Sequence, residues 1–287
     1  MSEAIVARAA VLGAISHAAE VELSAYVLQP EAALARALEA AADRGARVRV
    51  RLEGAPYEGH SPADGPAAAN RRVAAELRAH GVDVRLTRPD DPSLHLKAAL
   101  IDGTAYLDDR NWPAEGADTI VATNDPSDVR LVAEAFGESS GSDANLATDK
   151  EGALRFEADA IAGGTGGRVD VESESFGYSA VSKALYARAR AGSHVRLLVA
   201  EREFAEAGST ERGSLRRLAN AGVDVRVVAS DEKLCVAGGR GWIGSANATY
   251  SKGPVLDWGL ATCDPVLLGG IAAAFERNWA RARPVSL

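Results

Sequence analysis

The chain has 287 residues, long enough for two domains that each bury a core. Lys and Arg number 32 against 40 Asp and Glu, a formal net charge of −8 without a long basic run, so composition carries no clear nucleic-acid signature. No stretch approaches the roughly 20 apolar residues that span a bilayer, and the N-terminus lacks a signal-peptide pattern, so we expect a cytoplasmic protein.

The first half opens with apolar residues at helical spacing over residues 1–20, which predict an amphipathic helix. Residues 44–52 predict a helix end, a glycine and a strand. Residues 53–70, rich in Gly, Pro and Ala, predict a long loop at the lip of a site, over which His60 could reach. Residues 77–86 again predict a helix end, a glycine and an alternating strand.

Residues 95–102, His-Leu-Lys-Ala-Ala-Leu-Ile-Asp, place an imidazole, an ammonium and a carboxylate at fixed spacing in an apolar run. In a strand, His95 and Lys97 project from the same face and can converge on one ligand. Asp102 lies an odd number of residues further on, so we expect it to be a buried structural partner. Because a neutral imidazole is a nucleophile toward phosphorus and an ammonium stabilises charge on phosphate oxygens, this pattern indicates phosphoryl chemistry.

Three segments of the first half recur in the second half in the same order, which indicates a duplication. They are residues 44–52, 77–86 and 118–126, which recur as residues 191–199, 218–227 and 257–265. Small and polar residues crowd between 137 and 150, so we place one lobe at residues 1–140 and the second at residues 150–287. Because strands alternate with helices, we expect an α/β fold in which each lobe is a mixed β-sheet flanked by helices.

The two cysteines, Cys235 and Cys263, lie in apolar strand-like runs, so we expect reduced core residues rather than a disulfide. No Cys/His cluster has the spacing of metal ligands. The sequence therefore gives no reason to expect a metal site.

The second half repeats the motif at residues 231–238, Asp-Glu-Lys-Leu-Cys-Val-Ala-Gly, and follows it with Gly-Ser-Ala-Asn at 244–247. Together with residues 95–102, this arrangement resembles the phospholipase D superfamily over nearly the whole chain. The resemblance implies two lobes related by a pseudo-twofold axis, with both motifs meeting in one cleft. It also implies chemistry without a metal or cofactor, in which one histidine forms a phosphohistidine and a second protonates the leaving group and then activates water or an alcohol.

The resemblance also implies roles for individual residues. His95 would be the nucleophile, Lys97 and Lys233 would hold the phosphate, and Asp118 would orient the histidine. The other candidates are substrate-binding or structural: Asn111, Ser245, Asn247 and His60 beside the substrate, and Asp102 and Asp257 as structural carboxylates.

The second motif departs from the family pattern. Asp231 stands where the second histidine is expected, Gly238 replaces the second aspartate, and residues 108–111, Asp-Asp-Arg-Asn, replace the first Gly-Ser-x-Asn turn. Three interpretations follow. Asp231, Glu232 or His60 supplies the missing acid and the enzyme is active; the cleft binds phosphate without turnover; or the carboxylates select a substrate with a cationic part.

We favour the active enzyme, because a cleft without function would have little reason to retain the motif residues together. These residues are His95, Lys97, Asp102, Lys233 and Asn247. The expected activity is that of a phosphodiester hydrolase or a phosphatidyl or phosphoryl transferase. Its expected substrate is a small phosphodiester or a phospholipid head group, the latter approached by peripheral contact with lipid. A phosphate-binding or scaffold protein and a nuclease are the alternatives, and the oligomeric state stays open.

Overall fold

The computed structural model describes residues 3–57, 65–112 and 119–287, and the chain divides into two compact units. Unit 1 consists of Met1–Asp143 and Gly253–Trp258, and unit 2 consists of Ala144–Lys252 and Gly259–Leu287. The segment Gly253–Trp258 thus comes from the second half of the chain but packs with unit 1. The predicted division at residues 140–150 follows the order of the repeats along the chain, so it does not include this segment in the first lobe.

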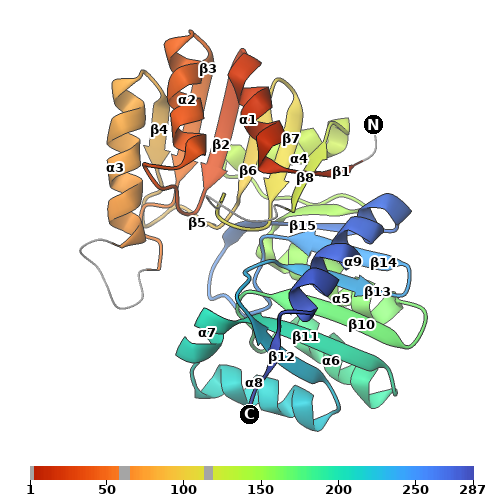
Figure 1. Cartoon of the computed structure of the whole chain (residues 1–287). Helices are drawn as coiled ribbons and strands as arrows, with labels where there is room; N and C mark the ends of the chain where they lie inside the picture. Colours follow the sequence, from red (N-terminus) through yellow and green to blue (C-terminus); the bar gives the residue numbers. More distant parts are fainter. Residues whose placement is uncertain (1–2, 58–64, 113–118) are drawn as a thin grey trace. The chain divides into compact units, whose positions relative to one another are not determined.

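Unit 1 begins with a strand and a helix in place of the single helix predicted for residues 1–20. The first strand forms because Ala4–Val6 pair antiparallel with Ile120–Ala122 of a later strand. The elements of unit 1 (Figure 1) are β1 (Ala4–Val6), α1 (Arg8–His17), β2 (Glu20–Ala25), α2 (Ala33–Asp43), β3 (Arg47–Leu52), α3 (Pro66–Ala79), β4 (Asp83–Leu86), β5 (Ser93–Leu94), β6 (Ala98–Ile101), β7 (Thr104–Asp108), β8 (Ile120–Thr123) and α4 (Pro126–Phe136).

The main sheet of unit 1 has the strand order β1-β8-β7-β6-β2-β3-β4. β2, β3 and β4 run parallel and are joined by the crossover helices α2 and α3, whereas β6, β7 and β8 form antiparallel pairs. β5 pairs instead with the first residues of β15 (Val255–Thr262), in the parallel register Ser93↔Val255 and Leu94↔Leu256. This short ladder is what ties the late segment Gly253–Trp258 into unit 1.

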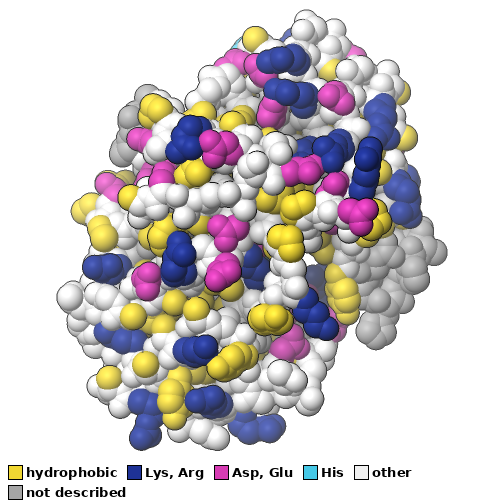
Figure 2. All heavy atoms as spheres, turned by 180° about the vertical axis from the view of Figure 1, so that it is seen from behind, with side chains coloured by type: hydrophobic (Ala, Val, Ile, Leu, Met, Phe, Trp, Pro, Cys, Tyr) yellow, Lys and Arg dark blue, Asp and Glu magenta, His cyan; other side chains and the backbone are white. Residues whose placement is uncertain are grey.

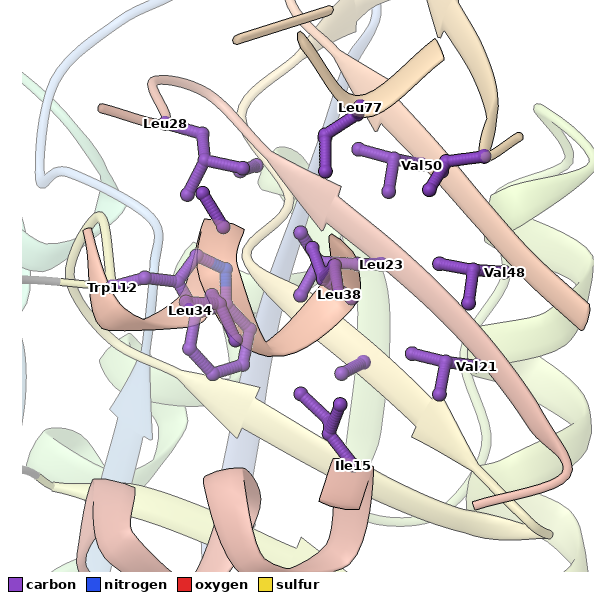
Figure 3. Close-up of a cluster of buried hydrophobic side chains, with 14 of the residues drawn as sticks. Ile15, Val21, Leu23, Leu28, Leu34, Leu38, Val48, Val50, Leu77 and Trp112 are labelled. Carbon is purple, nitrogen blue, oxygen red and sulfur yellow. The ribbon is translucent and has the colours of Figure 1, made fainter. Parts of the chain in front are cut away.

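One face of the main sheet is covered by α1, α2 and α3 (Figure 3). Along β3 the side chains alternate, so that Val48 and Val50 point into the core while Arg47 and Arg49 stay exposed. The helix residues Ile15, Leu34, Leu38 and Leu77 meet the strand residues Val21, Leu23, Val48 and Val50. Each such side chain contributes about 1.5–3 kcal/mol on burial, which holds the ends of the strands in fixed positions.

Unit 2 repeats this plan. Its elements are β9 (Leu146–Asp149), α5 (Lys150–Gly163), β10 (Arg168–Ser173), α6 (Ala180–Arg190), β11 (His194–Ala200), α7 (Glu201–Glu206), α8 (Ser209–Asn220), β12 (Asp224–Val228), β13 (Leu234–Ala237), β14 (Arg240–Gly244), the remainder of β15, α9 (Pro265–Trp279) and β16 (Arg283–Pro284). Its strand order is β16-β12-β11-β10-β13-β14-β15, with β9 also paired to β15. Side chains from α5, α6 and α8 share one apolar cluster with these strands.

The strand order confirms the duplication and the expected two-lobe α/β fold. The order β4-β3-β2-β6-β7-β8 of unit 1 recurs as β12-β11-β10-β13-β14-β15 in unit 2. The repeated Asp-Pro pair also has the same function in both units. Asp125 accepts a hydrogen bond from Ser127 N at the start of α4, Asp264 accepts from Val266 N and Leu267 N at the start of α9, and a proline follows each cap.

None of the helices in the described ranges has the length and the apolar run that a membrane crossing requires. Of the two cysteines, Cys235 is buried as expected, but Cys263 is exposed. The expectation of a core residue was wrong at Cys263 because β15 ends at Thr262, one residue before it.

Candidate active site

His95, Leu96 and Lys97 lie in the connection between β5 and β6 rather than inside a strand as predicted. The ladder between β5 and β15 sets their position. Leu94 is opposite Leu256, and His95 N donates to Leu256 O at 2.8 Å. The residues that follow these two leucines, His95 and Asp257, therefore come together. The register of a two-residue strand thus brings a carboxylate from the second half of the chain to the motif histidine.

The imidazole of His95 lies between a carboxylate and an ammonium. Its Nδ1 is 3.1 Å from Oδ2 of Asp257, which is fully buried, and its Nε2 is 2.8 Å from Nζ of Lys97. An ammonium can donate but cannot accept, and a carboxylate accepts. The neutral imidazole that satisfies both neighbours therefore carries its proton on Nδ1 and keeps the lone pair of Nε2 for acceptance or attack.

Tyr26, the residue after β2, supports the same pair. Its ring packs edge-on against His95 with 5.0 Å between the ring centroids, and Nζ of Lys97 lies 5.5 Å from the tyrosine centroid. Lys97 is buried, as is Leu96, whose carbonyl accepts a hydrogen bond from Ser24 Oγ. These contacts restrict the rotamers of the histidine and the lysine. Sequence reasoning did not select Tyr26, although the end of a parallel strand is a position where site residues commonly gather.

The turn at residues 108–111 occupies the position of Gly-Ser-Ala-Asn in unit 2. Asp108 N donates to Lys97 O at 2.9 Å, and Gly244 N donates to Lys233 O at 3.2 Å, so the two turns are equivalent. Asp108 is buried, and its Oδ2 accepts from Trp112 N at 2.6 Å. The carboxylate of Asp108 therefore stabilises its own turn. Asn111 at the end of this turn has a buried side-chain oxygen with no hydrogen-bond partner in the described part of the chain.

Unit 2 holds Lys233 in a different environment. Its Nζ is 3.1 Å from Oε2 of Glu174 and 2.8 Å from the main-chain oxygen of Asp231. Asn247 donates to the same Glu174 oxygen at 3.2 Å and accepts from Ser175 N. Glu174 follows β10 as Tyr26 follows β2, so the two residues occupy equivalent positions. Beside its motif lysine, unit 1 therefore has a phenol and unit 2 a carboxylate. Glu174, which sequence reasoning missed, thus joins the predicted residues Lys233 and Asn247, and Asp231 contacts Lys233 through its main-chain oxygen.

Glu232 belongs to a separate buried cluster. Its Oε2 accepts from Asn278 Nδ2 at 2.9 Å, and the same amide nitrogen lies 3.0 Å from both carboxylate oxygens of Glu172. Burial, together with the neighbouring charge of Glu232, raises the pKa of Glu172 to about 8. Glu232 is thus held by α9 in this cluster, whereas Asp231 contacts Lys233 through its main-chain oxygen.

Asp102 is exposed, which corrects the expectation of a buried partner. Its carboxylate accepts hydrogen bonds from Ala19 N and Glu20 N, where β2 begins. The equivalent Gly238 forms a direct main-chain contact instead, since its carbonyl accepts from Thr165 N at 3.2 Å. Asp102 and Gly238 share a left-handed backbone, with φ of 45° and 48°, and a Cβ at Gly238 would lie 1.4 Å from Thr165 O. The loss of the second motif aspartate therefore follows from chain packing.

Asp118 and His60 lie outside the described residues, so their predicted roles stay predictions. Ser245 is fully buried at the end of β14. Unit 1 brings together His95, Lys97 and Asp257, and unit 2 brings together Lys233, Asp231 and Asn247. That all six serve one site stays a prediction. No group of three or more His, Cys, Asp or Glu side chains that could hold a metal ion occurs in the ranges that the structure describes.

Comparison with known proteins shows which domain and which folds this chain resembles. Residues 11–138 match a family model described as "Cardiolipin synthase, PLD-like domain". A search of curated proteins found no match. The fold resembles that of phosphatidylserine synthase from Haemophilus influenzae Rd KW20, with 10% identity, a TM-score of 0.67, and coverage of 99% of this chain and 87% of that one. It also resembles polyphosphate kinase from Porphyromonas gingivalis, with 19% identity, a TM-score of 0.64, and coverage of 97% of this chain but half of that one.

Residues 11–138, somewhat less than half of the chain, thus match a PLD-like domain. The likeness to the two solved structures extends the fold over nearly the whole chain. This agrees with the resemblance drawn from the two motifs.

Proposed function

We propose that the protein is a phosphodiester hydrolase or phosphoryl transferase that works through a covalent intermediate on Nε2 of His95. The observation that carries this proposal is the series of contacts from Lys97 through His95 to Asp257. The buried carboxylate of Asp257 holds the proton on Nδ1 and stabilises the positive charge that develops on the ring during attack. Lys97 lies at Nε2, where it can contact the non-bridging oxygens of a bound phosphate.

In the first step, the Nε2 lone pair forms a bond to phosphorus while the bond between phosphorus and the leaving oxygen breaks. That oxygen takes a proton from a general acid. In the second step, water or an alcohol loses a proton to the same group and attacks phosphorus, and the bond to Nε2 breaks, which restores His95. Asp231 is the proposed acid and base, because it occupies the position of the second histidine while Glu232 is held by Asn278.

The substrate class that we propose is a small phosphodiester or a phospholipid head group. Asn111, with its buried unpartnered side-chain oxygen, is available to accept a hydrogen bond from such a substrate. The two lysines of the motifs supply positive charge for one phosphodiester. The cardiolipin synthase name of the matching family model agrees with a lipid-derived diester.

The test is to trap the intermediate. The protein is mixed with radiolabelled phosphodiesters, including glycerophosphodiesters, phospholipids in detergent and single-stranded DNA, and quenched in alkaline SDS because phosphohistidine is labile in acid. We expect label on the wild-type protein and none on His95→Asn, in which the amide retains a donor toward Asp257. His17→Asn, at an exposed position of α1, is the matched control and should label normally.

Two results would contradict the proposal. One is label that persists in His95→Asn, which would place the adduct elsewhere. The other is neither label nor turnover with any substrate of the panel, which would favour a phosphate-binding or scaffold protein. Adduct formation with DNA alone would identify a nuclease and reject the small-diester substrate.

A further inference from the structure

A groove runs between α6 and α8 in unit 2, and none of the motif residues is among those that line it. A cavity of about 430 Å³ at one end is lined by Tyr178, Ser182, Lys183, Tyr186, Thr210, Gly213, Ser214, Arg217 and Leu218. An adjoining cavity of about 350 Å³ shares Tyr186, Gly213 and Arg217 with it and extends the groove to Arg190, Arg216 and Asn220. The two cavities therefore form one continuous groove along the two helices.

The groove is cationic, although the whole chain carries a net charge of −8. Lys183, Arg190, Arg216 and Arg217 line it and are exposed, and no Asp or Glu is among the lining residues. Within the described residues, none of these four cations forms an ion pair. Figure 2 shows Lys and Arg side chains gathered at the lower end of unit 2 in that view. Four unpaired cations around a concave surface form an electrostatic site for an anion.

Two of the cations are positioned by aromatic rings. Nζ of Lys183 lies 4.9 Å from the centroid of Tyr178, and the guanidinium carbon of Arg217 lies 4.7 Å from the centroid of Tyr186. Contacts of this kind restrict the long side chains and reduce the entropy that they lose when a ligand binds. The rings thus hold the charges over the groove.

At two of the four cation positions the equivalent residue of unit 1 is a carboxylate, whereas Lys183 corresponds to Arg36. The repeat aligns Tyr186 and Arg190 of α6 with Glu39 and Asp43 of α2, because residues 191–199 match residues 44–52. It aligns Arg217 of α8 with Glu76 of α3, because residues 218–227 match residues 77–86. Both pairs of helices cover a sheet of the same topology. The fold therefore accepts carboxylates at the positions of Arg190 and Arg217, and its packing does not require a cation at either of them.

We propose that the groove between α6 and α8 binds an anion that carries several phosphate groups on one molecule. Lys183 and Arg190 are seven residues apart, about 10 Å along the helix, with Arg217 across the groove from Tyr186. A single phosphate engages one or two of these cations, whereas a chain of phosphates contacts cations at both ends of the groove. Binding here is separate from the chemistry proposed at His95.

The experiment is calorimetric titration of the full chain at about 0.1 M salt with sodium tripolyphosphate, and with orthophosphate in parallel. We expect tripolyphosphate to bind more tightly than orthophosphate. The double variant Lys183→Ala with Arg217→Ala should weaken tripolyphosphate binding about tenfold or more, through loss of charge-assisted hydrogen bonds. The matched control is Arg155→Ala with Arg277→Ala, which removes two exposed cations of unit 2 outside the groove and should leave binding unchanged.

A second variant exchanges charge without altering the fold. Arg190→Asp with Arg217→Glu introduces the residues that unit 1 carries at the same positions, and it should abolish binding. His95→Asn should bind tripolyphosphate like the wild type, which separates this site from the proposed active site. Equal affinity for orthophosphate and tripolyphosphate, an equal loss in the control variant, or binding to vesicles of anionic phospholipid without binding to tripolyphosphate would overturn the proposal.

Discussion

At the scale of single residues, Asp257 determines which ring nitrogen of His95 carries the proton. A buried carboxylate beside Nδ1 selects the tautomer whose Nε2 can attack, and an amide at that position can face the ring with either its oxygen or its NH₂ group. Asp257 does not touch the reacting phosphorus in this scheme. It acts through His95, as the carboxylate of other catalytic triads acts through its histidine.

Asp257→Asn is therefore expected to lower kcat by about 10³- to 10⁴-fold, by analogy with the amide substitution in a serine protease triad. The substrate that labels the protein in the trapping experiment serves for the rate measurement. Nitrogen-15 NMR of the His95 ring should show a shift of the proton from Nδ1 toward Nε2, and circular dichroism should report a native fold. An unchanged ring tautomer together with full activity would contradict the role of Asp257.

Asp102 contributes to stability through its hydrogen bonds and through its backbone conformation, and two substitutions can separate these contributions. Its carboxylate binds two main-chain N–H groups at the start of β2, and its backbone is left-handed. Asp102→Gly removes the hydrogen bonds but suits the backbone, and it should destabilise the protein by about 1 kcal/mol. Asp102→Ala loses the bonds and also strains the backbone, which should cost about 1 kcal/mol more.

Urea unfolding monitored by fluorescence checks this order. Turnover per folded molecule should be unchanged in both variants, because no contact of Asp102 involves His95 or Lys97. Equal stability of the alanine and glycine variants would show that the backbone conformation contributes nothing.

At the scale of elements, the repeated pattern was a sound guide to the sheets. Helix, glycine and strand followed one another as predicted at Gly81 and Gly222, which have φ of 82° and 100° and so end their helices in a left-handed conformation. The Asp-Pro pairs before α4 and α9 likewise start helices. These are local signals, in which the residue itself determines the backbone, and therefore they can be read from one sequence.

The contacts between residues of the candidate site could be predicted only in part, because most of them join distant segments of the chain. His95 and Lys97 could be found because their spacing is local. Asp257 could be named as a carboxylate, but its contact with His95 depends on a two-residue ladder between β5 and β15, whose residues are 162 positions apart in the chain. Glu174 belongs to no motif, and its proximity to Lys233 arises from the antiparallel pairing of β10 with β13. Long-range register, rather than local propensity, was the missing information.

The buried cluster between β10 and α9 predicts how stability varies with pH. Glu172 has a pKa of about 8 in the folded protein, because burial and the charge of Glu232 disfavour its ionisation, whereas the ordinary pKa of a glutamate is 4.5. The folded state therefore binds more protons than the unfolded state between these values. The stabilising contribution is complete below about pH 4.5 and is lost as the pH rises through 8.

Glu172→Gln keeps the shape but cannot ionise, so its stability should fall less between pH 5 and pH 9, by about 1–3 kcal/mol compared with the wild type. Chemical denaturation at a series of pH values measures this difference. Glu151→Gln, at an exposed position of α5, serves as control. Parallel stability curves for wild type and Glu172→Gln would show that Glu172 ionises normally.

At the scale of the whole molecule, the two halves share one fold but differ in their motif residues. Unit 1 retains the histidine with its carboxylate and lysine, while unit 2 retains a lysine that is paired with Glu174 and Asn247. Packing accounts for one loss in unit 2, since Gly238 lies against Thr165. It does not account for Lys233, whose ammonium is buried beside a carboxylate and therefore loses its hydration. A contribution of Lys233 to catalysis would explain why it has been kept.

That contribution can be measured without leaving an unpaired buried charge. Lys233→Met combined with Glu174→Gln removes the ion pair as a unit, so the fold should persist, and Glu174→Gln alone is the comparison. If Lys233 stabilises the phosphate attacked by His95, the double variant should lose about 10²- to 10³-fold in kcat/KM, in the range found for removal of one transition-state donor. The yield of trapped intermediate should fall in parallel. Undiminished kcat/KM in a folded double variant would assign the whole reaction to unit 1 and leave unit 2 with a binding role.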